Sequence, residues 1–582
     1  MASTLSIGTS ALLTAQGGLS TTSHNISNVN TEGYSRQRIE QSTRIPEYNG
    51  NQYFGTGVQV DDVRRLFDGF LSDQLRLFTS QEEQFDTFTT YSQQVEDLLA
   101  SDSLSLANGL ESFFDSVQAV ADDPTSISAR QVMLTEADTL ANRFNTIDSQ
   151  LDAFNSQVNL NLQSSVDDVN SLIQGIAELN VAITEAKGGT GATPNDLLDR
   201  RDKLVNDLSE LVSVTTVEQS NGSVNVFIGT GQPVVVGATT NQLSTIFDPN
   251  DSSRLLIGLG PNQVDISAQV TGGKLGGLLR VRSEVIDVTR AEIDTLASSM
   301  IETFNSQHKT GLTLDGAAGG NFFGPTNPAV PPVPDAGTIR VALTDPRDIA
   351  IAFPVQLGST SGNTGTGGLN IDSIDSSGVG FNAASTLSSP LTFSFDNTTN
   401  TYTVTYGAGN TATISYDPAV DSGKSFDLAN LTSPPNTPFP GALPPLTITL
   451  DGVPANGDSF VINNSTAGGF NGFGDNRNAL ALAELQVAKT MKPNGSGTPT
   501  QSFGDAYGIL VANVATRTKQ AQVGQETQQG LLDQTKTRFD SVSGVNLDEE
   551  AASLIKYQQT YQAAAQIITV SNTIFDTLIN SF

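Results

Sequence analysis

The chain has 582 residues, of which 37% are hydrophobic, and its 29 basic and 61 acidic residues give a net charge of −32. A chain of this length is expected to fold as several domains, and its negative field repels phosphate backbones, so we expect no nucleic acid among its partners. Because cysteine is absent and histidine occurs only twice, a disulfide framework, a thiolate site and a multi-histidine zinc site are excluded, and we expect no metal or other cofactor.

The first segment, MASTLSIGTSALLTAQGG, lacks both the basic stretch and the continuous apolar stretch of a cleaved secretory signal. No run of about 20 apolar residues occurs in the sequence, so we expect no membrane insertion. Apolar residues in this segment recur at every seventh position, which is typical of a coiled-coil seam. The predicted seam of this first helix consists of Leu5, Leu12, Leu19 and Ile26.

The stretch NISNVNTEGYSRQ, residues 25–37, predicts a turn out of this helix. Asn28 can bond to the local backbone and help to end the helix, and Gly33 can adopt a positive φ. Tyr34 can anchor the chain where it leaves the helix, and Arg36 supplies donors in an acidic chain. A plain exit into a loop without partner contacts is the alternative. The candidate site residues here are Asn25, Asn28, Asn30, Thr31, Gly33, Tyr34, Arg36 and Gln37.

Two long apolar stripes come next, over residues 71–99 and 140–183, with the three- and four-residue steps of a buried helix face. At a rise of about 1.5 Å per residue, the second stripe predicts a rod about 65 Å long. We therefore predict a body of long helices over residues 41–310, with a small β part, and returning helices over residues 471–543. Residues 1–40 are assigned to the first coiled-coil helix and its turn.

In the middle of the chain, apolar residues recur at every second position instead of every third or fourth. The stretches LTFSF, TYTVTY and TATISY alternate apolar and polar residues between residues 391 and 416, and polar turns separate them. This pattern predicts a β-meander. We assign residues 311–470 to an inserted all-β domain, which the proline-rich stretch GPTNPAVPPVPDAG joins to the helical part.

A seven-residue repeat returns at the end of the sequence, over residues 544–582. Asn546 can cap this last helix, and Glu549 stands at the capping-box position. The simplest way to bury both terminal seams is to pair the first helix with the last, and so short a pair should be marginal alone and become ordered on assembly. A stable pair packed on its own body is the alternative. The second seam consists of Leu547, Leu554, Tyr561, Ile568, Phe575 and Phe582.

Motifs of enzymes are missing from the sequence. No phosphate-binding G-x-x-x-x-G-K-[ST] loop and no G-x-S-x-G elbow occurs. A Ser-His-Asp catalytic triad would have to use one of the two histidines. We therefore expect a protein that is not an enzyme. The predicted fold is mainly α with an inserted all-β domain, elongated and multi-domain, with paired terminal helices and a long-helix body.

Both ends of the chain resemble a known family. The stretch TTSHNISNVNTEGYSRQ, residues 21–37, is similar to the N-terminal signature of the flagellar axial proteins, which comprise rod, hook and hook-associated proteins. The last stretch, SGVNLDEEAASLIKYQQTYQAAAQIITVSNTIFDTLINSF, resembles the terminus of the same family, and four internal stretches resemble its hook-associated members. Ser23 and His24 stand where the family signature often has Ala-Asn.

The resemblance implies a structural protein of the bacterial flagellum that forms a ring at the hook tip and joins hook to filament. The implied partners are other copies of the chain, the hook protein, a second junction protein on the filament side, and a cytoplasmic export chaperone that binds the C-terminal region. It further implies an extracellular location, reached by type III export without a cleaved signal. The terminal helices would line the inside of the ring, and the β domain would face outward.

Two other function classes remain open at this point. The β domain could make the chain a surface adhesin or binding module on a helical stalk, although such a binder needs no heptad at both termini. A fused peptidoglycan hydrolase or protease is the enzymatic alternative, and no motif of the chain supports it.

Overall fold

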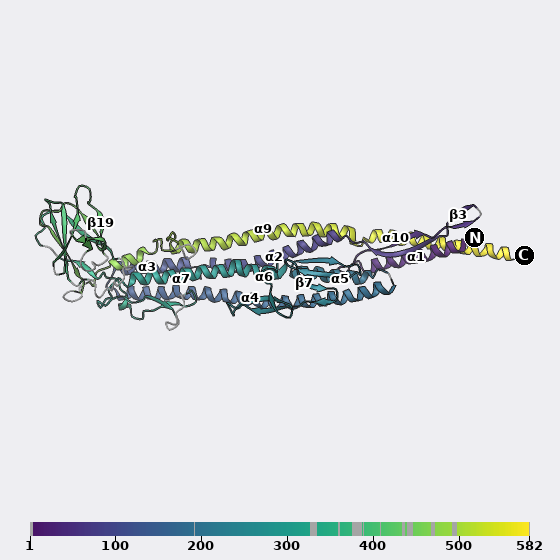
Figure 1. The fold of residues 1–582 in the computed structure, drawn as a ribbon, viewed down its shortest axis with the longest axis horizontal. Helices are drawn as coiled ribbons and strands as arrows, with labels where there is room; N and C mark the ends of the chain where they lie inside the picture. Colours follow the sequence, from purple (N-terminus) through teal and green to yellow (C-terminus); the bar gives the residue numbers. More distant parts are fainter. Residues whose placement is uncertain are drawn as a thin grey trace. The chain divides into compact units, whose positions relative to one another are not determined.

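The computed structural model describes residues 4–580 except 50, 191, 326–334, 359–360, 375–386, 388, 408, 434–436, 439–445, 467–471 and 492–496 (Figure 1). The chain divides into two compact units. The first comprises Met1–Gln94, Phe154–Val285 and Thr516–Phe582, and the second comprises Val95–Ala153 and Ile286–Ala515. The fold is mainly helical with a β-rich region and has more than one domain, as the sequence predicts.

Three long helices contribute residues to both units: α2 (Gly69–Ala100), α4 (Ile127–Thr190) and α9 (Phe503–Ser543). The helix α4 is longer than the apolar stripe that predicts it, and most of that stripe is buried, from Leu140 to Ile183. A buried stripe at helical spacing explains why so long a helix forms, because each turn places one apolar side chain in the core. Within the described residues, no helix combines the length and the apolar character needed to cross a bilayer.

The first unit contains the two terminal helices, α1 (Thr4–Ser27) and α10 (Leu547–Ile579), which lie side by side (Figure 1). After α1 the chain forms an antiparallel ribbon of β1 (Gln37–Thr43) and β4 (Val58–Arg65), and the hairpin of β2 (Glu47–Asn49) and β3 (Gln52–Phe54) lies between these two strands in the sequence. Because the two strands are antiparallel, the chain returns along the ribbon and continues into α2.

The small β part of the first unit follows α5 (Asn195–Leu211). A four-stranded antiparallel sheet runs in the order β5-β6-β7-β8, and a three-stranded sheet runs in the order β11-β10-β9. The helix α6 (Gly273–Val281) then leads into one π-helical turn, Arg282–Ile286. These strands are β5 (Val214–Glu218), β6 (Val224–Ile228), β7 (Gln232–Val236), β8 (Thr239–Thr240), β9 (Leu243–Phe247), β10 (Leu255–Leu259) and β11 (Val264–Asp265).

The helical part of the second unit consists of α3 (Leu106–Asp122), α7 (Asp287–His308) and α8 (Arg477–Glu484), with the strand pair β12 (Phe323–Pro325) and β13 (Ile339–Val341). Its core is a cluster of phenylalanine rings. Phe113 lies 5.2 Å from Phe304, and Phe322 lies 4.9 Å from Phe323, between ring centroids. Aromatic rings at these distances pack edge to face or tilted, which is their favoured arrangement.

The β-rich part of the second unit consists of a five-stranded sheet in the order β14-β23-β16-β17-β18, a three-stranded sheet in the order β15-β22-β19 and the strand pair β20-β21. The three strands predicted over residues 391–416 are confirmed as consecutive antiparallel neighbours. Their apolar side chains share one core with those of the three-stranded sheet. Most of the proline-rich stretch at 324–337 lies outside the described residues. The strands are β14 (Val355–Leu357), β15 (Gly368–Ile374), β16 (Leu391–Asp396), β17 (Thr401–Tyr406), β18 (Asn410–Ser415), β19 (Lys424–Asp427), β20 (Thr432–Ser433), β21 (Thr437–Pro438), β22 (Leu446–Asp451) and β23 (Ser459–Asn464).

Candidate functional site

The contact between α1 and α10 is made by small residues of α1. Gly8, Ala15 and Gly18 are buried in it. A Cβ atom added to Gly8 would lie 2.9 Å from Cγ1 of Ile568, and one added to Gly18 would lie 2.5 Å from Cε1 of Tyr557. Since real Cβ atoms do not come so close, the two helices approach each other at a distance that only glycine permits at these positions.

The predicted leucine seam does not coincide with these small residues: Leu5 and Leu12 stand three positions before Gly8 and Ala15, and Leu19 directly follows Gly18. The pair of helices therefore does not bury the seam fully within one chain. The physical reason is that the small residues let the backbones meet, while the wider side chains spread to the flanks. Leu12, Leu19, Ile26, Leu554 and Ile568 are partly buried, Leu5, Leu547, Tyr561 and Phe575 are exposed, and Phe582 lies outside the described residues.

Asn25, at the end of α1, is bonded to the following turn, to β1 and to α10. Its amide nitrogen donates to the backbone carbonyl of Gln37 at 2.9 Å and to Oε2 of Glu550 at 3.1 Å. Its amide oxygen accepts from Oη of Tyr34 at 2.7 Å and from the backbone N–H of Gln37 at 2.9 Å. The side chain is 1% exposed, so this amide uses its full bonding capacity in a site where water cannot replace a lost partner.

Arg36 links the same stretch to the start of α10. Its Nε donates to Oε1 of Glu550 at 2.6 Å, and its Nη1 donates to Glu549. Its backbone N–H donates to the carbonyl of Ser543 at 2.8 Å. Asn546 caps α10 by accepting from two backbone N–H groups, as predicted, whereas Glu549 of the expected capping box is paired with Arg36. Burial alone would lower the pKa of Arg36, but its bonds to the two glutamates raise it.

The residues between these anchors form a turn. Asn28 donates to the backbone carbonyl four residues earlier at 3.0 Å, and Thr31 donates to Oδ1 of Asn28 at 3.1 Å. Gly33 has a φ of 77°, a conformation that side chains disfavour, and a Cβ there would lie 3.0 Å from Cβ of Lys203. Asn30 is exposed. The hydrogen bonds of Asn28 and Thr31 thus stay within the turn. Those of Asn25 and Arg36 connect this part of the chain to α10.

The helix α5 holds the other side of the turn through its acidic residues. The backbone N–H of Ser35 donates to Oδ2 of Asp199 at 3.0 Å, and Nη1 of Arg65 donates to Oδ1 of Asp199 at 3.0 Å. The side chain of Gln37 donates to Oδ1 of Asp196 at 2.9 Å. Burial raises the pKa of Asp199, and the bonds from Ser35 and Arg65 oppose this rise.

Tyr34 remains a hydrogen-bond donor in this site. Burial raises the pKa of its phenol well above the usual range, and the charges of Asp196, Asp199 and Glu550 raise it further. The phenol therefore stays protonated at all physiological pH values, and its bond to Asn25 does not switch with pH.

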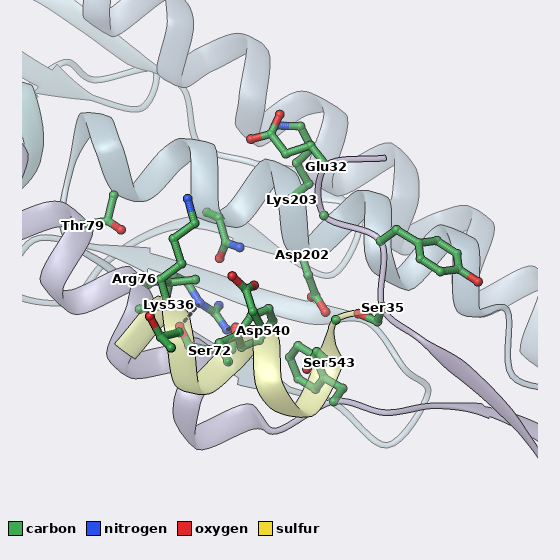
Figure 2. Close-up of a pocket in the computed structure, with 18 of the residues that line it drawn as sticks. Glu32, Ser35, Ser72, Arg76, Thr79, Asp202, Lys203, Lys536, Asp540 and Ser543 are labelled. Atoms are coloured by element: carbon green, nitrogen blue, oxygen red, sulfur yellow. Dashed lines mark hydrogen bonds and ion pairs between the residues drawn. The ribbon is translucent and has the colours of Figure 1, made fainter. Parts of the chain in front are cut away.

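A cleft of about 1080 Å³ lies beside the turn, between α2, α5 and the last turns of α9. Lys203 and Asp202 line it from α5, and Lys536 and Asp540 line it from α9 (Figure 2). Burial, followed by neighbouring carboxylates, raises the pKa of Glu83 in its wall to about 7. Among the residues that the structure describes, no group of three or more acidic, histidine or cysteine side chains is placed to hold a metal ion.

Several residues of this site cannot be singled out from the sequence. Glu550 is one of three acids in the first turn of α10, where any of them would complement the helix dipole. Asp199 meets Ser35 and Arg65 only in the folded chain. In the sequence, the alternation of acids and bases around Asp199 is typical of a solvent-exposed helix face, and no local signal marks this carboxylate as buried.

Comparisons with known proteins agree along the whole chain. The model "Flagellar hook-associated protein FlgK helical domain" matches residues 92–323, "Flagella basal body rod protein" matches residues 5–34, and "Flagellar basal body rod FlgEFG protein C-terminal" matches residues 537–581. The Flagellar hook-associated protein 1 of Escherichia coli (strain K12) is 32% identical over 604 residues, which cover 100% of both chains. That of Bacillus subtilis (strain 168) is 29% identical over 379 residues, which cover 59% of this chain and 75% of the relative.

One solved structure is similar over most of the chain. It is the flagellar hook junction protein FlgK from Burkholderia pseudomallei, which is 26% identical and superposes with a TM-score of 0.70. The match covers 81% of this chain and 100% of that one.

Proposed function

The chain belongs to the flagellar hook-associated protein 1 family and is a structural protein of the flagellar hook–filament junction, and we propose that neighbouring copies complete its fold by covering the exposed faces of α1 and α10. The protein would assemble as a ring at the hook tip and act without enzymatic activity. Its relatives are named as a flagellar hook-associated protein and a flagellar hook junction protein.

The single observation that carries this proposal is the apolar surface left on the terminal pair. Large apolar side chains remain exposed along α10, among them Leu547, Ile555, Ile567, Val570, Ile574 and Ile579. An apolar surface of this extent on a soluble chain marks an interaction site. Leu5, Tyr561 and Phe575 of the predicted seam are exposed as well, and a role of these residues in assembly is part of the proposal.

The small interface between α1 and α10 supports coupled folding and assembly. Glycine and alanine bury little apolar area, so the pair gains little from packing within one chain. Covering the flanking leucine, isoleucine and phenylalanine side chains by other copies would add about 1.5–3 kcal/mol for each side chain that becomes fully buried. The terminal helices would then reach full stability only in the ring.

Further partners follow from the family. We propose contacts with the hook protein on one side and with a second junction protein on the filament side, and a cytoplasmic chaperone that holds the C-terminal region before export. The chain would be exported without a cleaved signal and reside outside the cell. The β-rich insertion would face away from the axis of the ring. The adhesin alternative gains no support from the comparisons.

Removing α10 tests the proposal. A chain that ends at Ser543 should remain folded by circular dichroism but should not attach to hooks in a strain that lacks the protein, so that hooks stay bare and filament subunits are lost to the medium. Ile574→Asp should give the same result, whereas Ile509→Asp on α9, at a position of similar exposure, should restore filaments. Filaments on hooks that carry only the truncated chain would refute the proposal.

A further inference from the structure

The hairpin of β2 and β3 carries a second exposed apolar surface, which the sequence analysis did not identify. Ile45 is 89% exposed, Tyr53 is 73% exposed, and Tyr48 and Phe54 are also exposed. The rings of Tyr48 and Tyr53 lie 5.0 Å apart across the hairpin, so these two side chains form an aromatic pair on one face of the hairpin, and Phe54, the next residue on β3, points to its other face. Figure 1 shows this hairpin, labelled β3, beside the terminal helix pair.

The base of the hairpin is attached to α1. The backbone N–H of Val58 donates to Oγ of Ser10 at 3.3 Å, and Gly57 is so close to α1 that an added Cβ would clash with the Ser10 hydroxyl. Across the two strands, Thr56 donates to the backbone carbonyl of Ile45 at 2.8 Å. The patch is therefore presented from a defined place on the terminal pair.

The two apolar surfaces carry few charges. Residues 45–54 contain one charged residue, Glu47, and residues 561–579 contain one, Asp576, in a chain with a net charge of −32. Most other surfaces of two copies would repel each other. These two surfaces bring only one carboxylate each to a contact, which favours another copy of the same acidic chain as the partner.

We infer that the hairpin of one copy packs on the α10 stripe Ile567, Val570 and Ile574 of the next copy in the ring, an inference that rests on the proposed function. Within one chain both surfaces remain exposed, so the hairpin does not cover the stripe of its own α10. A contact between the hairpin of one copy and the stripe of the next is heterologous and can repeat around a closed ring. Tyrosine is among the side chains that protein interfaces most often use as anchors.

The absence of cysteine allows a direct test by cross-linking. Two full-length proteins, one with Tyr53→Cys and the other with Ile574→Cys, are mixed, assembled on hooks that lack the protein, and oxidised. We expect a disulfide-linked dimer that forms only on hooks. A matched mixture of Tyr53→Cys with Val420→Cys, at an exposed position of the β-rich part, should give none.

A second variant measures the strength of the contact. Tyr48→Ser combined with Tyr53→Ser should weaken attachment to hooks by about tenfold or more, as expected for the loss of aromatic anchors, while Val420→Ser leaves attachment unchanged. Chains that attach normally but give no 53–574 dimer would overturn the hairpin contact and leave the junction role intact. A wild-type chain that never attaches to hooks would overturn the junction role and the hairpin contact together.

Discussion

The amide nitrogen of Asn25, in the last turn of α1, donates to Oε2 of Glu550, in the first turn of α10, across 3.1 Å. Both side chains are almost completely buried, with 1% and 2% exposed. This bond connects residues 525 positions apart in the sequence. It fixes the place where the terminal helix pair, which other copies are proposed to cover, is attached to the rest of the first unit.

Asn25→Ala should loosen this attachment. The substitution leaves Glu550, Tyr34 and the backbone of Gln37 without their partner in a buried site, which should lower the local free energy of unfolding by about 3 kcal/mol. Hydrogen exchange at the end of α1 and the start of α10 would then be about 100-fold faster. Asn30→Ala, at an exposed position of the same turn, serves as the control and should leave exchange unchanged. Equal exchange in the two variants would show that the Asn25 bonds are not structural.

Two neighbouring glycines of α1 should respond in opposite ways to alanine. Gly18→Ala places a methyl group against the ring of Tyr557 and should destabilise the helix pair, whereas a Cβ at Gly17 meets nothing closer than 3.9 Å. Gly17→Ala should therefore stabilise α1 by up to about 1 kcal/mol through helix propensity. Hydrogen exchange of α1 measures both effects. Slower exchange in Gly18→Ala would contradict the close approach of the two helices.

This interface also shows how far the sequence could predict the site. The heptads at both ends correctly predict that the first and last helices meet, because leucine and isoleucine mark the period. They do not identify Gly8 and Gly18 as contacts, since a pattern of large apolar residues conceals a contact made by small ones. Partners such as Glu550 depend on long-range geometry, for which no local spacing gives a signal.

The strand order of the β-rich part can also be predicted only in part from the sequence. The alternation of residues 391–416 predicts three consecutive strands, because neighbours in the sequence pair directly. The place of β23 between β14 and β16 is not readable in the same way, since β14 and β23 are about 100 residues apart in the sequence and any exposed edge could in principle accept the strand.

His308 should make the second unit sensitive to acid. Burial lowers its pKa to about 4, and the neutral ring donates from Nδ1 to the carbonyl of Gly320 and accepts at Nε2 from the N–H of Ala350, both at 2.8 Å. The unfolded chain, with a histidine pKa of about 6.5, binds the proton more readily. The stabilising contribution is therefore complete above about pH 6.5 and is lost as the pH falls toward 4, by about 3 kcal/mol in total.

Nuclear magnetic resonance can follow this titration directly, because the chain has two histidines. The ring signal of His308 should not titrate above about pH 5. Replacing His24 by glutamine assigns the two signals, and His308→Asn should lower stability at pH 7 and reduce its dependence on pH between 6.5 and 4. A His308 signal that titrates near pH 6.5 in the folded protein would refute the buried neutral ring.

Two buried tyrosines of the β-rich part differ in their need for a hydroxyl group. Oη of Tyr402 has no hydrogen-bond partner among the described residues, whereas Oη of Tyr416 donates to the carbonyl of Gly452 at 2.7 Å. Tyr402→Phe should be neutral or stabilising by up to about 1 kcal/mol, and Tyr416→Phe should cost about 1 kcal/mol. Hydrogen exchange in β16, β17 and β18 distinguishes the two, and the reverse order would contradict the structure.

Maleimide labelling of the full chain with Ile574→Cys tests the central claim most directly. The account predicts rapid labelling of the free chain, in which Ile574 is exposed, and strong protection once the chain has assembled on hooks. Val420→Cys should be labelled equally in both states. Labelling of residue 574 that stays as fast on hooks as in solution would contradict the claim that neighbouring copies cover the terminal helices.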